Sequence, residues 1–172
     1  MKVQNYEFEL KKFKFLESRS YETNCFEAIL YVNGKKLADC GNDGQGGSTD
    51  IHFFPGSIEL GREIEAFLKK QPKITPKGFN FQLDFTLEYI VDDLVQECLK
   101  AQELKKFKNL AKKHLVFKNT KGNYITIKWK KHTLDSLLKI PKGREALKQT
   151  IAQEIAKGSI LFNENIPREL LP

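Results

Sequence analysis

Residues 25–40 read CFEAILYVNGKKLADC, with strand-forming residues leading into the dipeptide Asn33-Gly34. A two-residue turn of type I′ needs positive φ at both central positions, and Asn-Gly is the pair that adopts this conformation most readily. The aromatic and β-branched residues before the turn are typical of paired strands. The stretch therefore predicts an antiparallel hairpin within an N-terminal sheet.

The segments around this hairpin complete the N-terminal part of the chain. Alternating apolar residues in 6–15, interrupted at Lys11-Lys12, predict a long strand with a bulge at the lysine pair. Residues 51–54 predict a short strand, and the helical spacing of apolar residues after Ser57, a suitable N-cap, predicts a helix that ends before Pro72. In residues 75–84 the pattern is ambiguous, and the alternation of Phe79, Phe81 and Leu83 favours a strand.

The rest of the chain alternates between helical and strand patterns. Apolar residues at helical spacing predict a long amphipathic helix from Thr86 to Cys98, and the pattern allows it to continue, with or without a break, to Lys113. A second hairpin is predicted in 114–118 and 124–130, followed by helices in 133–139 and 143–157, the second ending at Gly158, and a last strand in 160–162.

Strands that come in runs, separated by helices, favour an α+β fold over an alternating parallel sheet. A chain of 172 residues suits one domain, so we expect a single α+β domain over 1–172. The longest apolar run is five residues, in 28–32, which is far too short for a membrane span. Three cysteines without CxxC spacing, and an N-terminus unlike a signal peptide, favour a reduced, cytoplasmic protein with no membrane partner.

The charge is distributed unequally along the chain. The half from Leu99 to Pro172 has seventeen Lys/Arg against six Asp/Glu, whereas the half from Met1 to Cys98 has twelve against sixteen. A surface of one sign raises the local concentration of the opposite charge. The basic half, 99–172, therefore predicts a polyanionic partner, either a nucleic acid or the phosphates of a nucleotide.

Several lysines of this half are predicted to lie on the solvent side of their elements. The candidate phosphate-binding residues are Lys105, Lys108, Lys112, Lys113, Lys128, Lys130 and Lys131. Lysine is a flexible point charge suited to phosphate, whereas readout of bases prefers arginine, of which the chain has four. Binding should therefore be directed at the backbone and sensitive to salt. The alternative is a solvated surface with no ligand.

A glycine-rich loop, GNDGQGGSTD in 41–50, follows the first hairpin. Backbone N–H groups of such a loop can bind an anion, although the loop lacks the GK[ST] ending of a phosphate-binding loop. The alternative is a long turn held by hydrogen bonds of its Asn and Asp side chains. The candidate contact residues are Asn42, Asp43, Gly44, Gly46, Gly47 and Ser48.

The run LYVNGKKLADCGNDGQGG, Leu30 to Gly47, resembles small uncharacterised proteins of phages and plasmids, in which an NG hairpin leads into an NDGxGG loop. The residues that carry the resemblance are Asn33, Gly34, Asn42, Asp43, Gly44, Gly46 and Gly47. Relatives often have Cys or His after the paired glycines, where this chain has Ser48 and Thr49. The resemblance implies a mobile genetic element, and so the cytoplasm of a host cell, but no activity.

Catalytic patterns are weak, and the sequence predicts no catalytic residue, metal or cofactor. His52, His114 and His132 are scattered, and each lies in or beside a predicted strand. Cys40 and His52 could form a thiolate and base pair, but no third group to orient them is evident and a buried strand cysteine is the simpler interpretation.

The sequence therefore favours a non-enzymatic phage or mobile-element protein that binds a polyanion through its lysine-rich surface. One alternative is an anti-defence protein that inhibits a host immune protein of the CRISPR, CBASS or Thoeris type, or sequesters its nucleotide signal. Another is a metal-dependent hydrolase that uses Asp43, Asp50 and His52. The pattern does not indicate an oligomeric state.

Overall fold

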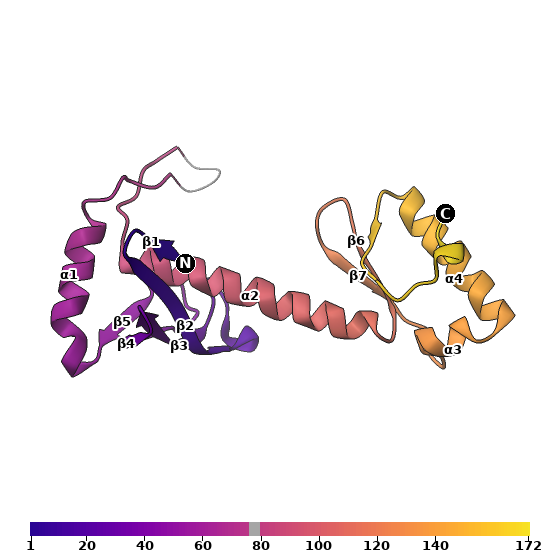
Figure 1. Ribbon diagram of the computed structural model, residues 1–172, viewed down its shortest axis with the longest axis horizontal. Coiled ribbons are helices and arrows are strands. Elements are labelled where there is room, and N and C mark those ends of the chain that lie inside the picture. The colour runs from indigo at the N-terminus through magenta and orange to yellow at the C-terminus, as the bar shows by residue number, and fades with distance from the viewer. Residues whose placement is uncertain (76–79) are drawn as a thin grey trace. The chain divides into compact units, whose positions relative to one another are not determined.

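The structure, a computed structural model, describes residues 1–75 and 80–172 (Figure 1). Helices and antiparallel sheets occur together, which confirms the α+β class. The chain divides into two compact units, unit 1 (Met1–Lys100) and unit 2 (Ala101–Pro172). The division lies within two residues of the change from the acidic to the basic half of the sequence.

The elements follow one another in the order β1–β5, α1, α2, β6, β7, α3, α4 and β8. The strands are β1 (Lys2–Val3), β2 (Tyr6–Phe15), β3 (Phe26–Val32), β4 (Lys35–Asn42), β5 (Asp50–Phe53), β6 (Leu115–Lys118), β7 (Tyr124–Ile127) and β8 (Ile160–Leu161). The α-helices are α1 (Ile58–Leu68), α2 (Leu87–Ala111), α3 (Leu134–Leu138) and α4 (Pro141–Ala156). Short 3-10 helices are η1 (Glu17–Arg19), η2 (Pro55–Ser57) and η3 (Arg168–Leu170).

Unit 1 contains an antiparallel sheet in the order β1-β2-β3-β4-β5. The turn between β3 and β4 has φ of 48° at Asn33 and 76° at Gly34, which confirms the predicted hairpin. The Asn33 side chain ties this turn to the start of β2 and to the β1–β2 turn, because its Oδ1 accepts from Glu7 N at 2.8 Å and its Nδ2 donates to Asn5 O at 3.1 Å. The predicted bulge in β2 is also present, with positive φ at Lys12 and a register shift between Lys11 and Lys14.

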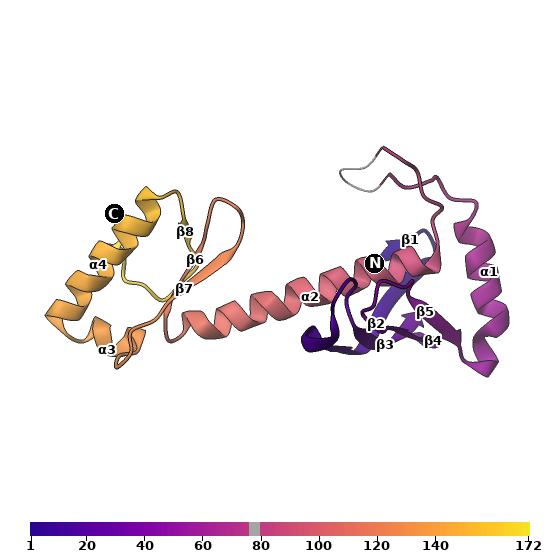
Figure 2. The same ribbon diagram turned by 180° about the vertical axis from the view of Figure 1, so that it is seen from behind.

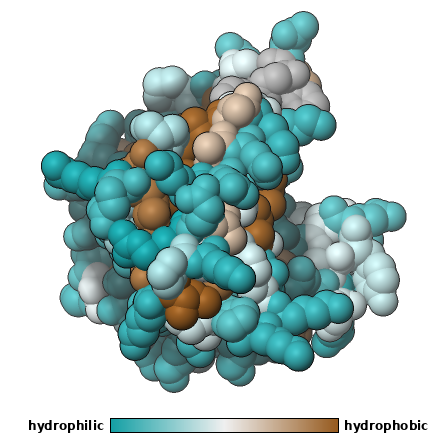
Figure 3. All heavy atoms as spheres, turned by 90° about the vertical axis from the view of Figure 1, so that its right-hand side faces the viewer, coloured by the Kyte–Doolittle hydropathy of each residue, from teal (hydrophilic) through white to brown (hydrophobic). Residues whose placement is uncertain are grey.

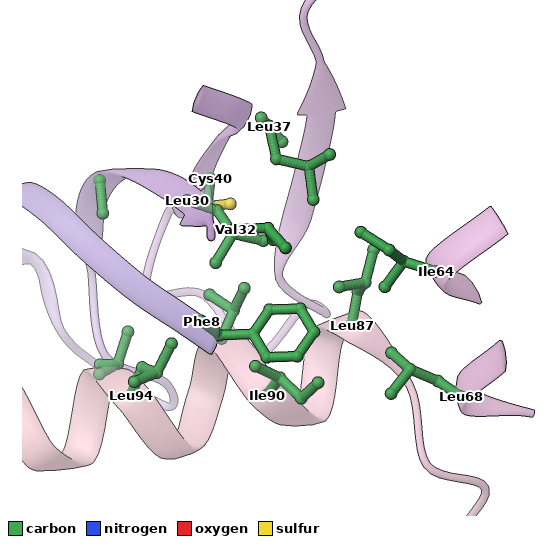
Figure 4. Close-up of a cluster of buried hydrophobic side chains, with 14 of the residues drawn as sticks. Phe8, Leu30, Val32, Leu37, Cys40, Ile64, Leu68, Leu87, Ile90 and Leu94 are labelled. Atoms are coloured by element: carbon green, nitrogen blue, oxygen red, sulfur yellow. The ribbon is translucent and has the colours of Figure 1, made fainter. Parts of the chain in front are cut away.

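The core of unit 1 lies where one face of this sheet meets the first turns of α2 and the inner side of α1. Figure 4 shows Phe8 of β2 beside Leu87 and Ile90 of α2, with Ile64 of α1 next to them. Each of these four side chains is at most 2% exposed. Burial of one such side chain contributes about 1.5–3 kcal/mol. The alternation of β2 and the helical spacing of α2 therefore decide which faces meet.

Two local expectations are modified in unit 1. Ser57 precedes α1 as predicted, but its hydroxyl donates to the Lys36 carbonyl at 3.0 Å and makes no cap bond. In the predicted strand over 75–84, Phe79 lies outside the described residues. In the described part, Leu83 pairs with Ile74 in an isolated bridge, with backbone hydrogen bonds of 2.8 Å in both directions. Only this single bridge, and no longer ladder, forms among the residues described there.

Unit 2 contains a three-stranded antiparallel sheet in the order β7-β6-β8, and Figure 2 shows β8 next to β6. Leu115 and Phe117 of β6, both fully buried, pack with α3 and α4. On the opposite face the ring of Phe107, from the last turns of α2, stacks on Tyr124 with centroids 4.3 Å apart. The second hairpin is thus confirmed, and α2 continues without a break to Ala111.

The second strand of this hairpin is shorter than predicted. β7 ends at Ile127, and the chain then turns so that Trp129 pairs with His132 in an isolated bridge. Lys128 therefore lies just after the strand and Lys130 in the turn, so the two do not alternate along a strand. The helix after it begins as the sequence indicates, because Thr133 Oγ1 accepts from Ser136 N at 3.3 Å.

Candidate functional site

The glycine-rich loop of unit 1 is organised by Asn42, the last residue of β4. Its side-chain Oδ1 accepts from Thr23 Oγ1 at 2.6 Å and from Gly44 N at 2.9 Å, while its Nδ2 donates to Gly47 O at 2.9 Å. Asp43 Oδ1 accepts from Gln45 N at 3.0 Å. The bonds from Gly44 N to Asn42 and from Gln45 N to Asp43 are Asx turns, as expected if the loop is a long turn held by its Asn and Asp side chains. The Asn-Asp pair is therefore explained without a ligand.

Gly44 joins this loop to the segment around η1. It is buried with φ of +85°, and its carbonyl accepts backbone N–H bonds from Tyr21 and Glu22 at 3.0 Å each. A Cβ atom at this position would collide with the Arg19 carbonyl oxygen and contact Cys25. The close approach and the positive φ both require glycine here.

The two adjacent glycines differ in their surroundings. Gly46 has φ of +94° and lies against the Glu22 carboxylate, and its N–H donates to Thr23 Oγ1 at 3.3 Å. Gly47 has no positive φ, and nothing lies within 4 Å of the place a Cβ would take. Gly46 is therefore needed by the turn, whereas nothing in the described structure requires a glycine at position 47.

The far end of the loop is hydrogen-bonded to α2. Thr49 N donates to Glu88 Oε1 at 3.1 Å, and Thr49 Oγ1 donates to Asp92 Oδ1 at 2.6 Å. Removal from water raises the pKa of Asp92 above its usual value; the Thr49 hydroxyl opposes this shift, and the Glu88 charge adds to it. The carboxylates of Glu88, Asp92 and Asp93 line a cavity of about 340 Å³ beside the loop.

The charge of this cavity bears on the predicted phosphate contact. The N–H groups of Gly44, Gln45 and Gly46 are bonded within the chain, and the carboxylates beside the loop would repel a phosphate. Ser48 is exposed at the rim of the cavity. A contact of this loop with a ligand or partner stays a prediction, and its surroundings favour a cationic group over an anionic one.

The structure separates Cys40 from His52. Cys40 is in register with Ile51 and faces the core, whereas His52 is in register with Asp39 and is exposed. Burial raises the pKa of the Cys40 thiol to about 12, so it is not a thiolate at neutral pH. Within residues 1–75 and 80–172, no three His, Cys, Asp or Glu side chains gather that could hold a metal ion.

In unit 2 the seven candidate lysines are all exposed. Lys105 and Lys108 lie in the last turns of α2, and Lys112 directly follows the helix. Lys113 follows α2, and its carbonyl accepts from Leu134 N at 2.8 Å. Lys128 directly follows β7, and Lys130 and Lys131 form the turn between Trp129 and His132. We call these seven residues, in 105–113 and 128–131, the basic face.

Very little negative charge neutralises unit 2. Among its described residues only Arg144 and Lys157 make ion pairs, with Glu169 at 2.8 Å and Glu154 at 2.7 Å. None of the lysines of the basic face has a described carboxylate within the 4.0 Å of an ion pair. Figure 3 shows hydrophilic side chains over most of the face of unit 2 turned to the viewer, with hydrophobic ones exposed between them.

Two lysines of the basic face line a cavity that the sequence did not indicate. This cavity, which we call the Lys108 cavity, has a volume of about 470 Å³. Its lining includes Lys108, Lys112, Asp135, Phe162, Glu164 and Asn165. Lys108 comes from the last turns of α2 and Lys112 directly follows that helix, Asp135 comes from α3, and the other three residues follow β8, the partner of β6. Residues from three separate segments of unit 2 thus meet at one place.

Asn163 holds two of these segments together. It is buried, its Oδ1 accepts from Val116 N at 2.7 Å, and its Nδ2 donates to Ala111 O at 2.7 Å and His114 O at 2.9 Å. One side chain therefore satisfies the carboxyl end of α2 and the start of β6. A lone asparagine near the C-terminus carries no pattern, so the sequence indicated neither Asn163 nor the cavity beside it.

A comparison of the chain with protein-family models, with curated proteins and with solved structures finds no match. The resemblance to phage and plasmid proteins therefore stays a prediction. Among the described residues, no helix has the length and hydrophobicity that crossing a membrane would need. The function therefore has to be inferred from the chemistry of the two units themselves.

Proposed function

We propose that this protein binds the phosphate backbone of a nucleic acid through the basic face of unit 2. The observation that supports this most is the uncompensated charge of that face: its seven lysines are exposed and have no ion-pair partner among the described residues. Exposed, unpaired lysines repel one another, and their binding to phosphates is favourable because it releases the cations condensed on the nucleic acid. The proposed activity is binding alone, and we assign no catalytic residue to it.

The arrangement also favours contacts to phosphate over readout of base sequence. Unit 2 has two arginines, and Arg144 is engaged with Glu169. Lysine contacts position a protein on a nucleic acid without specifying sequence. We therefore expect binding with little sequence preference from these contacts and with a steep dependence on salt. The acidic loop cavity of unit 1 is not part of this proposed interface.

The test changes Lys105, Lys108, Lys112, Lys128 and Lys130 together to glutamine. Affinity for a fluorescein-labelled 20-nucleotide DNA, measured by anisotropy over a range of salt concentrations, should fall. The slope of log K against log salt should become shallower by about one unit for each phosphate that the variant no longer neutralises. The melting temperature should stay near that of the wild type because all five side chains are exposed.

A matched control makes the same change of charge in unit 1. Lys2, Lys35, Lys36, Lys69 and Lys70 are exposed and form no ion pair among the described residues. Their change to glutamine should leave the affinity and the slope close to the wild-type values. An equal decrease in affinity in the two variants would show that net charge alone, and not the basic face, attracts the DNA. No binding by the wild type would refute the proposal.

A further inference from the structure

The Lys108 cavity holds opposite charges apart. Lys108 and Lys112 line it from the end of α2, and Asp135 and Glu164 line it from other segments, yet no N···O distance between these described side chains is within the 4.0 Å of an ion pair. Lys112 Nζ donates to Asn109 Oδ1 at 3.2 Å and keeps further donors free. A ligand suited to this cavity carries a negative group for the lysines and hydrogen-bond donors for the carboxylates.

The rest of the lining includes an aromatic ring and a side-chain amide. Phe162 is fixed in place, because its N–H donates to Val116 O at 2.8 Å and its ring meets Tyr124 edge-on at 5.1 Å. Asn165 Oδ1 accepts from Asn163 Nδ2 at 3.3 Å, which leaves the Asn165 Nδ2 donors without a partner among the described residues. An aromatic wall with an oriented amide suits a flat, polar ring.

The walls are also held in fixed relation to one another. Asn163 bonds to the Ala111 and His114 carbonyls at the end of α2, and residues 162, 164 and 165 surround it in the chain. The segment with the ring, carboxylate and amide is therefore anchored to the helix with the lysines. A volume of about 470 Å³ lies in the usual range for small-molecule sites.

We infer that the Lys108 cavity takes one unpaired nucleotide whose base carries an exocyclic amino group, such as cytosine. The lysines would meet the phosphate, Phe162 would contact the base, and Glu164 or Asp135 would accept from the amino group, as carboxylates do from cytosine N4. The inference rests on the proposed function and sharpens it: the nucleic acid is single-stranded where it enters this cavity, because a base stacked within a duplex cannot enter the cavity and lie against the Phe162 ring.

The test compares two single strands of equal charge, dC10 and dT10, by fluorescence anisotropy at one salt concentration. Thymine lacks the exocyclic amino group, so the wild type should bind dC10 at least fivefold more tightly. Glu164→Gln should reduce this ratio to within twofold of one, chiefly by weakening dC10. Asp135→Asn/Glu164→Gln serves as a second variant, in case either carboxylate can replace the other. Both positions are exposed, and circular dichroism checks that the variants fold.

Glu103→Gln is the matched control, because Glu103 is an exposed carboxylate of unit 2 that does not line the cavity. It removes the same charge and should leave the dC10 to dT10 ratio unchanged. If Glu164 only repelled the phosphates, Glu164→Gln would increase the affinity for dC10 and dT10 equally. This result would overturn the inference. So would equal affinities of the wild type for dC10 and dT10.

Failure of this inference differs from failure of the proposed function. If dC10, dT10 and a duplex of the same charge bind equally well and with steep salt dependence, the basic face binds phosphate and the cavity takes no base. If no strand binds, the proposed function fails. A nuclear magnetic resonance titration with 5′-CMP then tests whether the Lys108 cavity by itself binds a nucleotide. Chemical-shift changes of the Asn165 side-chain amide with 5′-CMP, and none with inorganic phosphate, would support the inference. The absence of such changes with 5′-CMP would overturn it.

Discussion

Three glycines of unit 1 should respond very differently to the same change to alanine. Gly34 has φ of +76° and nothing within 4 Å of a Cβ position, Gly44 has φ of +85° and a Cβ would strike the Arg19 carbonyl, and Gly47 has neither problem. The left-handed conformation costs a non-glycine residue about 1–2 kcal/mol. Forced contact in a packed site adds about 1–3 kcal/mol.

The expected free energies of unfolding follow from these terms. Gly34→Ala should decrease the free energy of unfolding by about 1–2 kcal/mol, and Gly44→Ala by about 2–5 kcal/mol, from strain and contact together. Gly47→Ala should change it little or increase it by about 0.4–1 kcal/mol, because alanine restricts the unfolded chain. Urea unfolding followed by circular dichroism measures all three, provided that their m-values agree.

The order of the three variants is what tests the reasoning. In a unit of 100 residues, 1 kcal/mol corresponds to a shift of about 4–8 °C in melting temperature, so the differences are well resolved. If Gly44→Ala were no less stable than Gly34→Ala, the docking of the loop on the η1 segment would be wrong. If Gly47→Ala were destabilised as much as Gly44→Ala, position 47 would be packed rather than open.

Four further outcomes are expected. Gly47→Ala, folded, should bind any partner that contacts the loop cavity at least tenfold more weakly (about 1.4 kcal/mol); affinity within twofold of wild type would leave the loop a scaffold. Cys40, whose pKa is raised to about 12, should resist a thiol reagent at pH 8 until the protein is unfolded, and rapid labelling would show that the β4–β5 face opens. Asn163→Ala should destabilise unit 2 by about 3 kcal/mol or more, because it leaves Val116 N and the carbonyls of Ala111 and His114 without their hydrogen-bond partner. An unchanged melting temperature would refute the role of Asn163 as an anchor. Thr49→Val removes the hydroxyl that lowers the pKa of Asp92, so a nuclear magnetic resonance titration should find this pKa raised further. Because the pKa of Asp92 in the folded protein already lies above its unfolded value, the free energy of unfolding of this variant should fall more steeply as the pH rises from the unfolded to the folded pKa.

Sequence by itself determined the local elements whose signal lies within a few residues. The Asn33-Gly34 turn, the bulge at Lys12, the helix from Leu87 and the end of α4 at Gly158 were all predictable. Each depends on positive φ or on hydrophobic periodicity, and both are properties of a residue and its near neighbours. The concentration of positive charge in 99–172 was likewise readable from composition alone.

Only the tertiary structure decided which residues of those elements contact one another. Gly44 and Gly47 look alike in the sequence, and only contact with the Arg19 carbonyl separates a required glycine from a free one. Cys40 and His52 were separated by strand register, which places them on opposite faces of the sheet. Lys108 and Glu164 lie more than fifty residues apart in the chain and meet at one cavity because Asn163 anchors the segment after β8 to the end of α2. Contacts at such separations depend on how packed faces close on one another, and no pattern within a short window of sequence records that.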